Sequence, residues 1–193
     1  LLLAYATDTS GNNSATNSVN FQYVVPQYAS VGLFPYPSAG GSVSGGGSYQ
    51  AGTTVTITAS ANSGFVFSSW TLNGVVVSRS PGYTFTLQSN LVLTATFQDT
   101  TAPTVSITNL SAGQRISNTV FTVKGTSSDN WQMGNVAYQM NGGAWSNAVT
   151  VNNWTNWSAD LILVPGTNLL LAYATDTSGN NSATNSVNFQ YVV

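Results

Sequence analysis

The sequence predicts an all-β protein made of small modules in tandem. Apolar and polar residues alternate in short runs, as at Val55, Ile57 and Ala59, and this period of two is that of strands with one buried face. Ser, Thr and Asn, which favour strand surfaces and turns over helix interiors, are abundant. In addition, residues 1–25 and 169–193 have the same sequence. Together these observations indicate folded β-modules in a repeating chain.

The repeat sets the expected domain organisation. Its two copies start at residues 1 and 169, which are 168 residues apart, so the chain contains one full period and the end of the period before it. We expect residues 1–25 to be the C-terminal hairpin of a preceding sandwich, residues 26–99 to form one module, and residues 100–193 to form a second. Two modules in each period agree with ordinary domain sizes.

The charge content excludes several classes of function. Only 4% of residues are charged, with three basic and five acidic side chains, and His, Glu and Cys are absent. No Ser-His, Cys-His or Glu pair can therefore be assembled, and we expect no enzyme. Three basic residues cannot neutralise a phosphate track, so nucleic acid is not an expected partner. Copies of the chain are expected partners, because a nearly uncharged surface repels its neighbours weakly.

The module expected at residues 26–99 begins at Pro26, which ends the preceding strand because proline lacks a backbone donor. The stretch "GFVFSSW" and the final strand "LVLTATF" follow glycine-rich and Thr/Val-rich strands. Over residues 28–98 this pattern resembles the divergent internalin-type B-repeat. The resemblance implies a compact β-grasp-like spacer of bacterial surface proteins without catalytic activity. The residues that fit the family pattern are Gly41, Tyr49, Gly52, Gly64, Phe65, Phe67, Trp70, Ala95 and Phe97.

The segment of residues 100–193 predicts an immunoglobulin-like β-sandwich. About seven short strands follow one another, separated by turn signals such as Pro165-Gly166. The stretches "TAPTVSIT", "VKGTSSDN" and "AYATDTSGN" resemble bacterial immunoglobulin-like modules of surface proteins. The last two strands form the repeated hairpin, so residues 1–25 need the other strands of a sandwich, because an isolated hairpin is marginal in water.

Three arrangements can supply those strands. The preceding domain can belong to the same continuous chain, the hairpin can be swapped into a neighbouring molecule, or it can be donated to a neighbour's open sandwich. Tandem surface repeats favour the first arrangement, and the sequence leaves all three open.

Three aspartates are candidate ligands for an interdomain calcium ion. Asp99 precedes the sandwich, Asp129 follows its second strand, and Asp176 lies at the hairpin turn, so all three are expected at the pole that faces the preceding module. Calcium prefers hard oxygen ligands of this kind. The competing interpretation is turn chemistry, because Asp and Asn bond their own backbone in turns. No other cofactor is expected.

Two tryptophans are candidates for stacking on a sugar ring. Trp131, which lies in a loop, and Trp154 are expected to be exposed, whereas Trp157 alternates with Ala159 and Leu161 and is assigned to the core.

The leading functional hypothesis is a structural repeat unit of an extracellular, cell-surface stalk, fibre or filament, without catalytic activity. The alternative is an adhesion or carbohydrate-binding module that uses exposed loops and tryptophans to bind a glycan. No stretch of about 20 apolar residues predicts a membrane span within this sequence.

Overall fold

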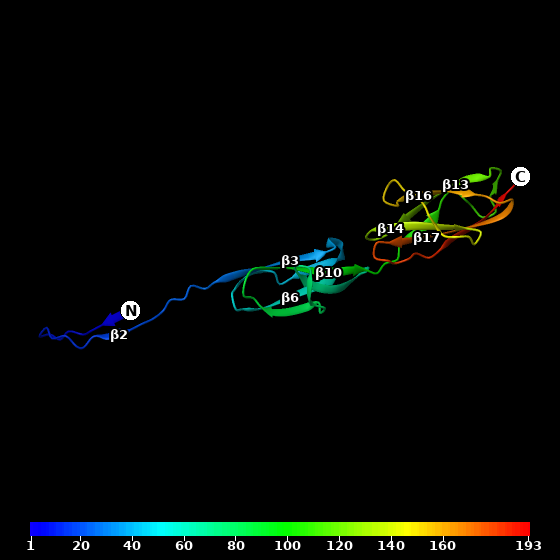
Figure 1. The fold of residues 1–193 in the computed structure, drawn as a ribbon. Coiled ribbons are helices and arrows are strands. Elements are labelled where there is room, and N and C mark those ends of the chain that lie inside the picture. The colour runs from blue at the N-terminus through cyan, green and yellow to red at the C-terminus, as the bar shows by residue number, and fades with distance from the viewer.

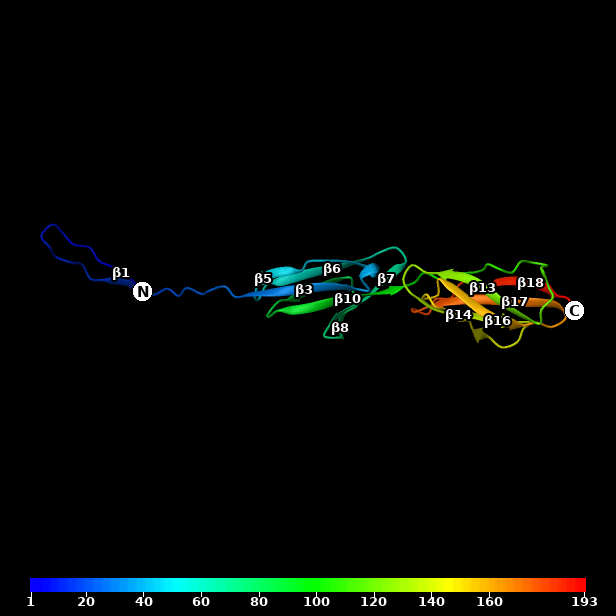
Figure 2. The ribbon, with the colours of Figure 1, turned by 90° about the horizontal axis from the view of Figure 1, so that it is seen from above.

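The computed structural model describes residues 1–193 as three bodies along one axis (Figure 1). A hairpin at the N-terminal end is followed by two β-modules that lie end to end in both views (Figure 2). All the regular structure is β apart from one 3-10 turn, Ser38–Gly40. The prediction of an all-β chain is therefore confirmed. No helix is long or apolar enough to pass through a bilayer.

The N-terminal hairpin pairs β1 (Leu2–Ala4) with β2 (Asn17–Val19) in antiparallel fashion. It forms a two-stranded sheet of its own, and its side chains pack against neither module. Residues 20–27 continue from it as an extended segment to the first module (Figure 1).

The first module is a pair of sheets packed face to face. In the larger sheet β3 (Tyr28–Tyr36) and β10 (Leu91–Asp99) are parallel neighbours, and the other pairs are antiparallel. The five-stranded sheet runs in the order β5 (Gly47–Gln50), β3 (Tyr28–Tyr36), β10 (Leu91–Asp99), β7 (Phe65–Leu72), β8 (Val75–Ser78). The three-stranded sheet runs β4 (Gly41–Ser44), β6 (Thr54–Ala61), β9 (Gly82–Thr86).

The predicted β-grasp-like arrangement is not what the structure shows for this module. Its two sheets enclose the core between them, with Val55 and Ile57 from β6 facing Leu93 and Ala95 from β10. The Thr/Val alternation identified the strands correctly, but it does not specify whether a helix or a second sheet covers them. In this module a three-stranded sheet packs against the five-stranded one.

The second module is a sandwich of the predicted immunoglobulin type. One sheet contains β11 (Thr104–Ile107), β13 (Val120–Ser128) and β16 (Asn156–Ile162). The other runs β12 (Arg115–Ile116), β18 (Asn185–Tyr191), β17 (Gly166–Asp176), β14 (Met133–Met140), β15 (Ser146–Asn147). The short β12 joins β18 in parallel, and the remaining pairs are antiparallel.

Trp157 lies in the core of this sandwich, as its alternation predicted. Its side chain is 2% exposed, and its indole N–H donates to the carbonyl of Thr126 at 3.2 Å. The ring packs over Gly125, where a Cβ atom would lie 2.2 Å from Trp157 Cε2. Glycine is therefore required at this position of β13, since any larger residue would displace the ring.

A short linker connects the two modules. Thr100 donates its backbone N–H to the carbonyl of Gly64 at 2.8 Å, and β11 begins at Thr104. Gly64 has a φ of +85°, and a Cβ there would lie 2.5 Å from Thr101 Oγ1 and 3.0 Å from Asn130 Nδ2. The loop of the second module that contains Asn130 thus packs directly on a turn of the first.

Candidate metal centre

The three predicted aspartates meet at the joint between the modules. Asp99 is the last residue of β10, Asp129 follows β13, and Asp176 is the last residue of β17. One carboxylate oxygen from each lies within 4.8 Å of the other two. The sandwich topology brings the loop after β13 and the turn after β17 to one pole, and the short linker holds Asp99 against that pole.

Hydrogen bonds across the joint position Asp99. The side-chain amide of Asn130 donates to Asp99 Oδ1 at 3.1 Å, and that of Asn180 donates to the Asp99 carbonyl at 3.1 Å. Both asparagines belong to the second module, while Asp99 ends a strand of the first. The two modules are therefore joined by polar contacts as well as by the chain itself.

The two buried carboxylates of the cluster differ in how fully they are hydrogen-bonded. Asp176, 4% exposed, accepts from the backbone N–H groups of Ser178 and Asn180, and its second oxygen accepts from the Asn180 side chain. Asp99, 2% exposed, uses Oδ1 to accept from Thr101 and Asn130, but its Oδ2 is buried without a donor. An unpaired buried carboxylate oxygen is costly and calls for a partner.

Asp129 has the same imbalance. Its Oδ2 accepts from the backbone N–H of Trp131 at 3.0 Å, and its Oδ1 is buried without a donor. Burial raises the pKa of the Asp129 carboxyl above its ordinary value of 3.8, and the negative charges of Asp99 and Asp176 raise it further, against the lowering by the Trp131 hydrogen bond. The site therefore disfavours three unscreened negative charges.

No cation balances the cluster from within the protein. Every donor to the three carboxylates is a backbone N–H or an asparagine amide. Two unit charges separated by 4.8 Å or less repel by at least about 3 kcal/mol at an effective dielectric constant of about 20. Turn chemistry, the competing interpretation, accounts for all the bonds of Asp176 but leaves one oxygen of Asp99 and one of Asp129 unexplained.

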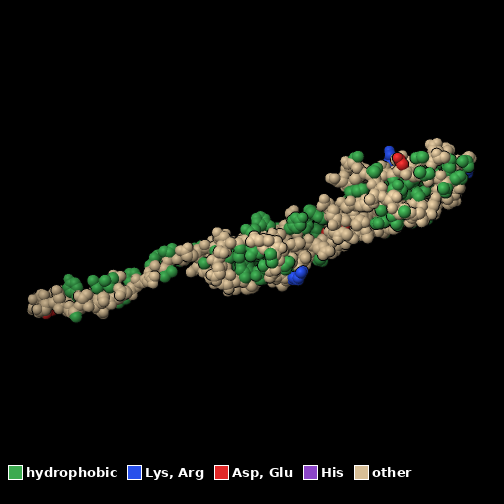
Figure 3. Space-filling model, viewed as in Figure 1, with side chains coloured by type: hydrophobic (Ala, Val, Ile, Leu, Met, Phe, Trp, Pro, Cys, Tyr) green, Lys and Arg blue, Asp and Glu red, His purple; other side chains and the backbone are tan.

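The remaining aspartates lie elsewhere. Asp160, on the exposed face of β16, accepts from the Thr122 hydroxyl at 2.6 Å. Asp8, in the N-terminal hairpin, accepts from Ser10 and Asn12, as Asp176 accepts from Ser178 and Asn180. Charge is sparse over the rest of the surface, as Figure 3 shows for one face.

The two candidate tryptophans line a single cavity of about 420 Å³ beside Asp129. Trp131 is 40% exposed, whereas Trp154 is half-buried and packs against the core of the sandwich. Apart from Met133, their neighbours in this cavity are polar, and include Ser127, Gln132 and Asn153. The structure thus brings the two rings to one depression but leaves only Trp131 broadly accessible.

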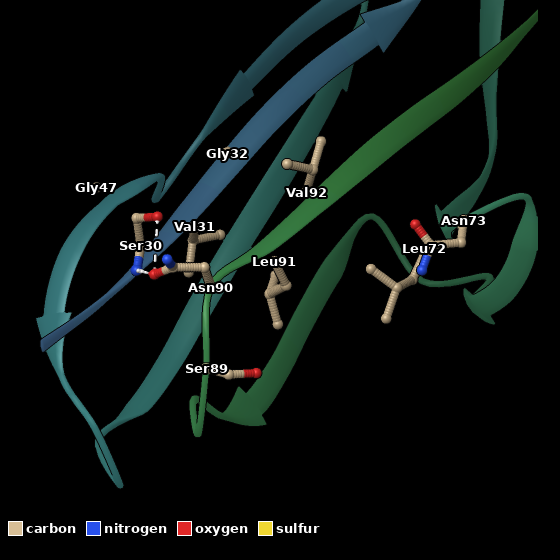
Figure 4. A pocket seen from close by; sticks show the side chains of 10 residues that line it. All are labelled: Ser30, Val31, Gly32, Gly47, Leu72, Asn73, Ser89, Asn90, Leu91 and Val92. Carbon is tan, nitrogen blue, oxygen red and sulfur yellow. Dashed lines mark hydrogen bonds between the residues drawn. The ribbon is translucent and has the colours of Figure 1, made fainter.

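A pocket of about 650 Å³ lies in the first module (Figure 4). Asn90 Oδ1 accepts there from the backbone N–H of Ser30 at 2.8 Å and from its hydroxyl at 3.1 Å. The lining includes Val31, Leu72 and Leu91, and no titratable side chain. The pocket therefore offers shape but no acid, base or charged group.

Sequence reasoning missed Gly64 and Asn180 as parts of the joint. Gly64 was assigned only to the B-repeat pattern, and Asn180 was one of many turn asparagines. The sequence feature that could have identified Asn180 is its position four residues after Asp176. From that position its side-chain amide donates both to Asp176 Oδ2 and to the Asp99 carbonyl of the first module.

Comparison with protein families gives a match to most of the first module. Residues 35–101 match the family model described as "Divergent InlB B-repeat domain". The predicted resemblance to the internalin B-repeat is confirmed. The matched residues run through Asp99, so one ligand of the candidate metal centre lies at the end of the B-repeat segment.

Solved structures of other proteins are also similar in part. The fibronectin(III)-like modules of Clostridium thermocellum CbhA are 16% identical, with 46% of this chain and 97% of theirs covered and a TM-score of 0.40. The SrpA adhesin of Streptococcus sanguinis is 17% identical, with 49% of this chain and 59% of that chain covered and a TM-score of 0.37. A comparison with curated proteins finds no match.

Proposed function

We propose that this chain is a non-catalytic structural repeat unit of an extracellular stalk, fibre or filament at a cell surface. The observation that carries the proposal is the joint, where a short linker and cross-module hydrogen bonds hold two autonomous cores end to end. Such an arrangement spaces whatever lies at the two ends of the array. The B-repeat match of residues 35–101 supports a surface location.

The N-terminal hairpin supports the repeating character of the unit. Leu2, Val19 and Phe21 are 62%, 56% and 70% exposed, whereas the same residues of the second copy, Leu170, Val187 and Phe189, are 0%, 8% and 0% exposed. We infer that residues 1–25 are the last two strands of a preceding sandwich in the same chain. Within that array each B-repeat module is followed by an immunoglobulin-like one.

The test is the dimension of a longer array. Chains with one, two and three periods of 168 residues are compared by electron microscopy and small-angle X-ray scattering. A stalk predicts that the maximum dimension grows by a constant increment for each period, because each joint is fixed. Compact particles whose length does not rise in proportion to the number of periods would contradict the proposal.

The second candidate function is adhesion or carbohydrate binding, favoured by the shared cavity of Trp131 and Trp154. A glycan array probed with residues 1–193 tests it, with Trp131→Ala as the variant and Trp145→Ala, on another part of the same sandwich, as the control. Binding that is lost only with Trp131→Ala supports recognition by this cavity. Absence of binding, or equal binding by all three proteins, rejects it.

A further inference from the structure

We infer that the joint between the two modules is a binding site for one Ca²⁺ ion, held by Asp99, Asp129 and Asp176 together. The inference rests on the geometry of the joint alone and stands or falls independently of a stalk role.

The positions of the carboxylates suit a single ion. Two oxygens that share a calcium at 2.3–2.6 Å lie no more than about 5 Å apart. The three aspartates each offer an oxygen within 4.8 Å of the others, so one cation can contact all three without a rearrangement of the backbone. The carboxylates come from three separate segments, namely the end of β10, the loop after β13 and the end of β17.

The unpaired oxygens give independent support for a ligand. Asp99 Oδ2 is buried within a side chain that is only 2% exposed, and it has no hydrogen-bond donor. Asp129 Oδ1 is likewise buried and unpaired. Hydrogen bonds from Thr101 and Trp131 hold the other oxygen of each carboxylate, which orients the free oxygens. Such an arrangement is expected when one oxygen of Asp99 and one of Asp129 bind a metal while hydrogen bonds fix the other oxygen of each carboxylate.

The choice of calcium follows from the ligand chemistry. The site offers three carboxylates, and no imidazole or thiolate occurs anywhere in the chain. Such hard oxygen ligands suit Ca²⁺, which accepts six to eight oxygens in flexible geometry, and water or backbone carbonyls complete the shell. A pocket of about 320 Å³, lined by Asp99, Trp131 and Thr177 among others, lies beside the joint.

Calcium would couple the orientation of the two modules. Asp99 belongs to the first module and the other two ligands to the second, so the ion binds only when the modules hold the arrangement seen here. Without the ion, mutual repulsion of the three carboxylates opposes that arrangement.

Calorimetric titration of CaCl2 into metal-stripped protein of residues 1–193 tests the inference. We expect one Ca²⁺ per chain, with a Kd in the range of about 0.1–1 mM that is usual for extracellular modules. Asp99→Asn and Asp129→Asn should each weaken binding at least tenfold, because each keeps an acceptor for its backbone donor but removes a charge. Asp160→Asn, which removes a carboxylate outside the cluster, should bind as the parent does.

The repeat provides a second matched pair. Asp176→Asn and Asp8→Asn disturb the same turn, with the same hydrogen bonds, but only Asp176 lies at the joint. Only Asp176→Asn should abolish the Ca²⁺ response. An equal loss from both variants would assign the effect to the turn and overturn the inference.

Thermal unfolding separates a metal site from a structural one. Ca²⁺ should raise the Tm of the parent protein by mass action. In EDTA, Asp99→Asn should melt higher than the parent since repulsion is relieved, and in 10 mM CaCl2 it should melt lower. Failure of this reversal, no binding up to 10 mM CaCl2, or equally tight Mg²⁺ binding would each overturn the assignment. If the three carboxylates share a proton and bind no metal, the Tm would rise on acidification and would not change with Ca²⁺ concentration. That result would also overturn the assignment.

Discussion

The same 25 residues occur twice in this molecule, once bare and once inside a sandwich. Both copies pair in the same register, with Leu2 opposite Val19 as Leu170 is opposite Val187. The turn is also reproduced, down to the isolated bridge of Thr7 with Asn13 and of Thr175 with Asn181. Local sequence therefore fixes the register and turn of the hairpin, whereas burial comes only from the other strands.

The difference between the copies lies in what surrounds them. In the C-terminal copy β17 covers residues 169–176 and β18 covers Asn185–Tyr191, whereas each strand of the N-terminal copy has three residues. Asn180 also reaches the Asp99 carbonyl, a contact that the equivalent Asn12 does not make. The rest of the sandwich thus extends the pairing of the two hairpin strands, and the preceding module adds the contact with Asp99. Each copy of the hairpin can therefore serve as a control for the other.

The largest expected effect comes from truncating the same phenylalanine in each copy. Phe189→Ala should lower the free energy of unfolding of the second module by about 3–5 kcal/mol, because the ring is fully buried. Phe21→Ala, at a ring that is 70% exposed, should leave both modules unchanged. Denaturant unfolding followed by tryptophan fluorescence measures both. Equal losses would mean that the N-terminal hairpin packs on a module after all.

A smaller effect is expected at the serine of the hairpin turn. Ser182 Oγ accepts from the N–H of Ala174 at 2.9 Å, and Ser14 Oγ accepts from Ala6 in the same way. Ser182→Ala should cost about 1–3 kcal/mol because Ala174 is buried and loses its side-chain acceptor, while water replaces the acceptor in Ser14→Ala. Amide hydrogen exchange at Ala174 and Ala6 measures the two losses. Matching changes in protection would refute the distinction.

The pH response should distinguish the exposed turn from the joint. The Asn12 side chain and backbone lower the pKa of Asp8 below 3.8, whereas burial raises the pKa of Asp129 above 3.8. Asp8 therefore stabilises its turn above pH 3.8, and this is lost as the pH falls through its lowered pKa. Asp129 favours the folded joint below pH 3.8, and this is lost as the pH rises through its raised pKa. Carboxyl NMR titration in EDTA should give midpoints on opposite sides of 3.8, and midpoints in the reverse order would contradict the structure.

The smallest expected effect comes from deletion of residues 1–25. The hairpin forms a separate sheet, so its removal should leave the melting temperatures of both modules unchanged. Differential scanning calorimetry of residues 26–193 beside residues 1–193 provides the measurement. A fall of several degrees in either transition would show that the hairpin stabilises a module in this chain.

Much of the fold follows from local patterns in the sequence. Alternation identified the strands around Val55 and Trp157, and the position of the three aspartates in a sandwich topology predicted one pole. The structural features that the sequence did not predict depend on packing between distant segments. The second sheet of the B-repeat module and the half-burial of Trp154 are set by long-range contacts, which a period of two does not encode. The unpaired oxygens at Asp99 and Asp129 likewise emerge only from the folded joint.

The central claim is that residues 1–25 are sandwich strands that lack their partners here. It is tested most directly by a chain in which a second copy of residues 101–168 precedes Leu1, with amide exchange measured across the first hairpin. We predict that Leu2, Val19 and Phe21 become as protected as Leu170, Val187 and Phe189. A first hairpin that still exchanges as fast as in residues 1–193 would contradict the claim.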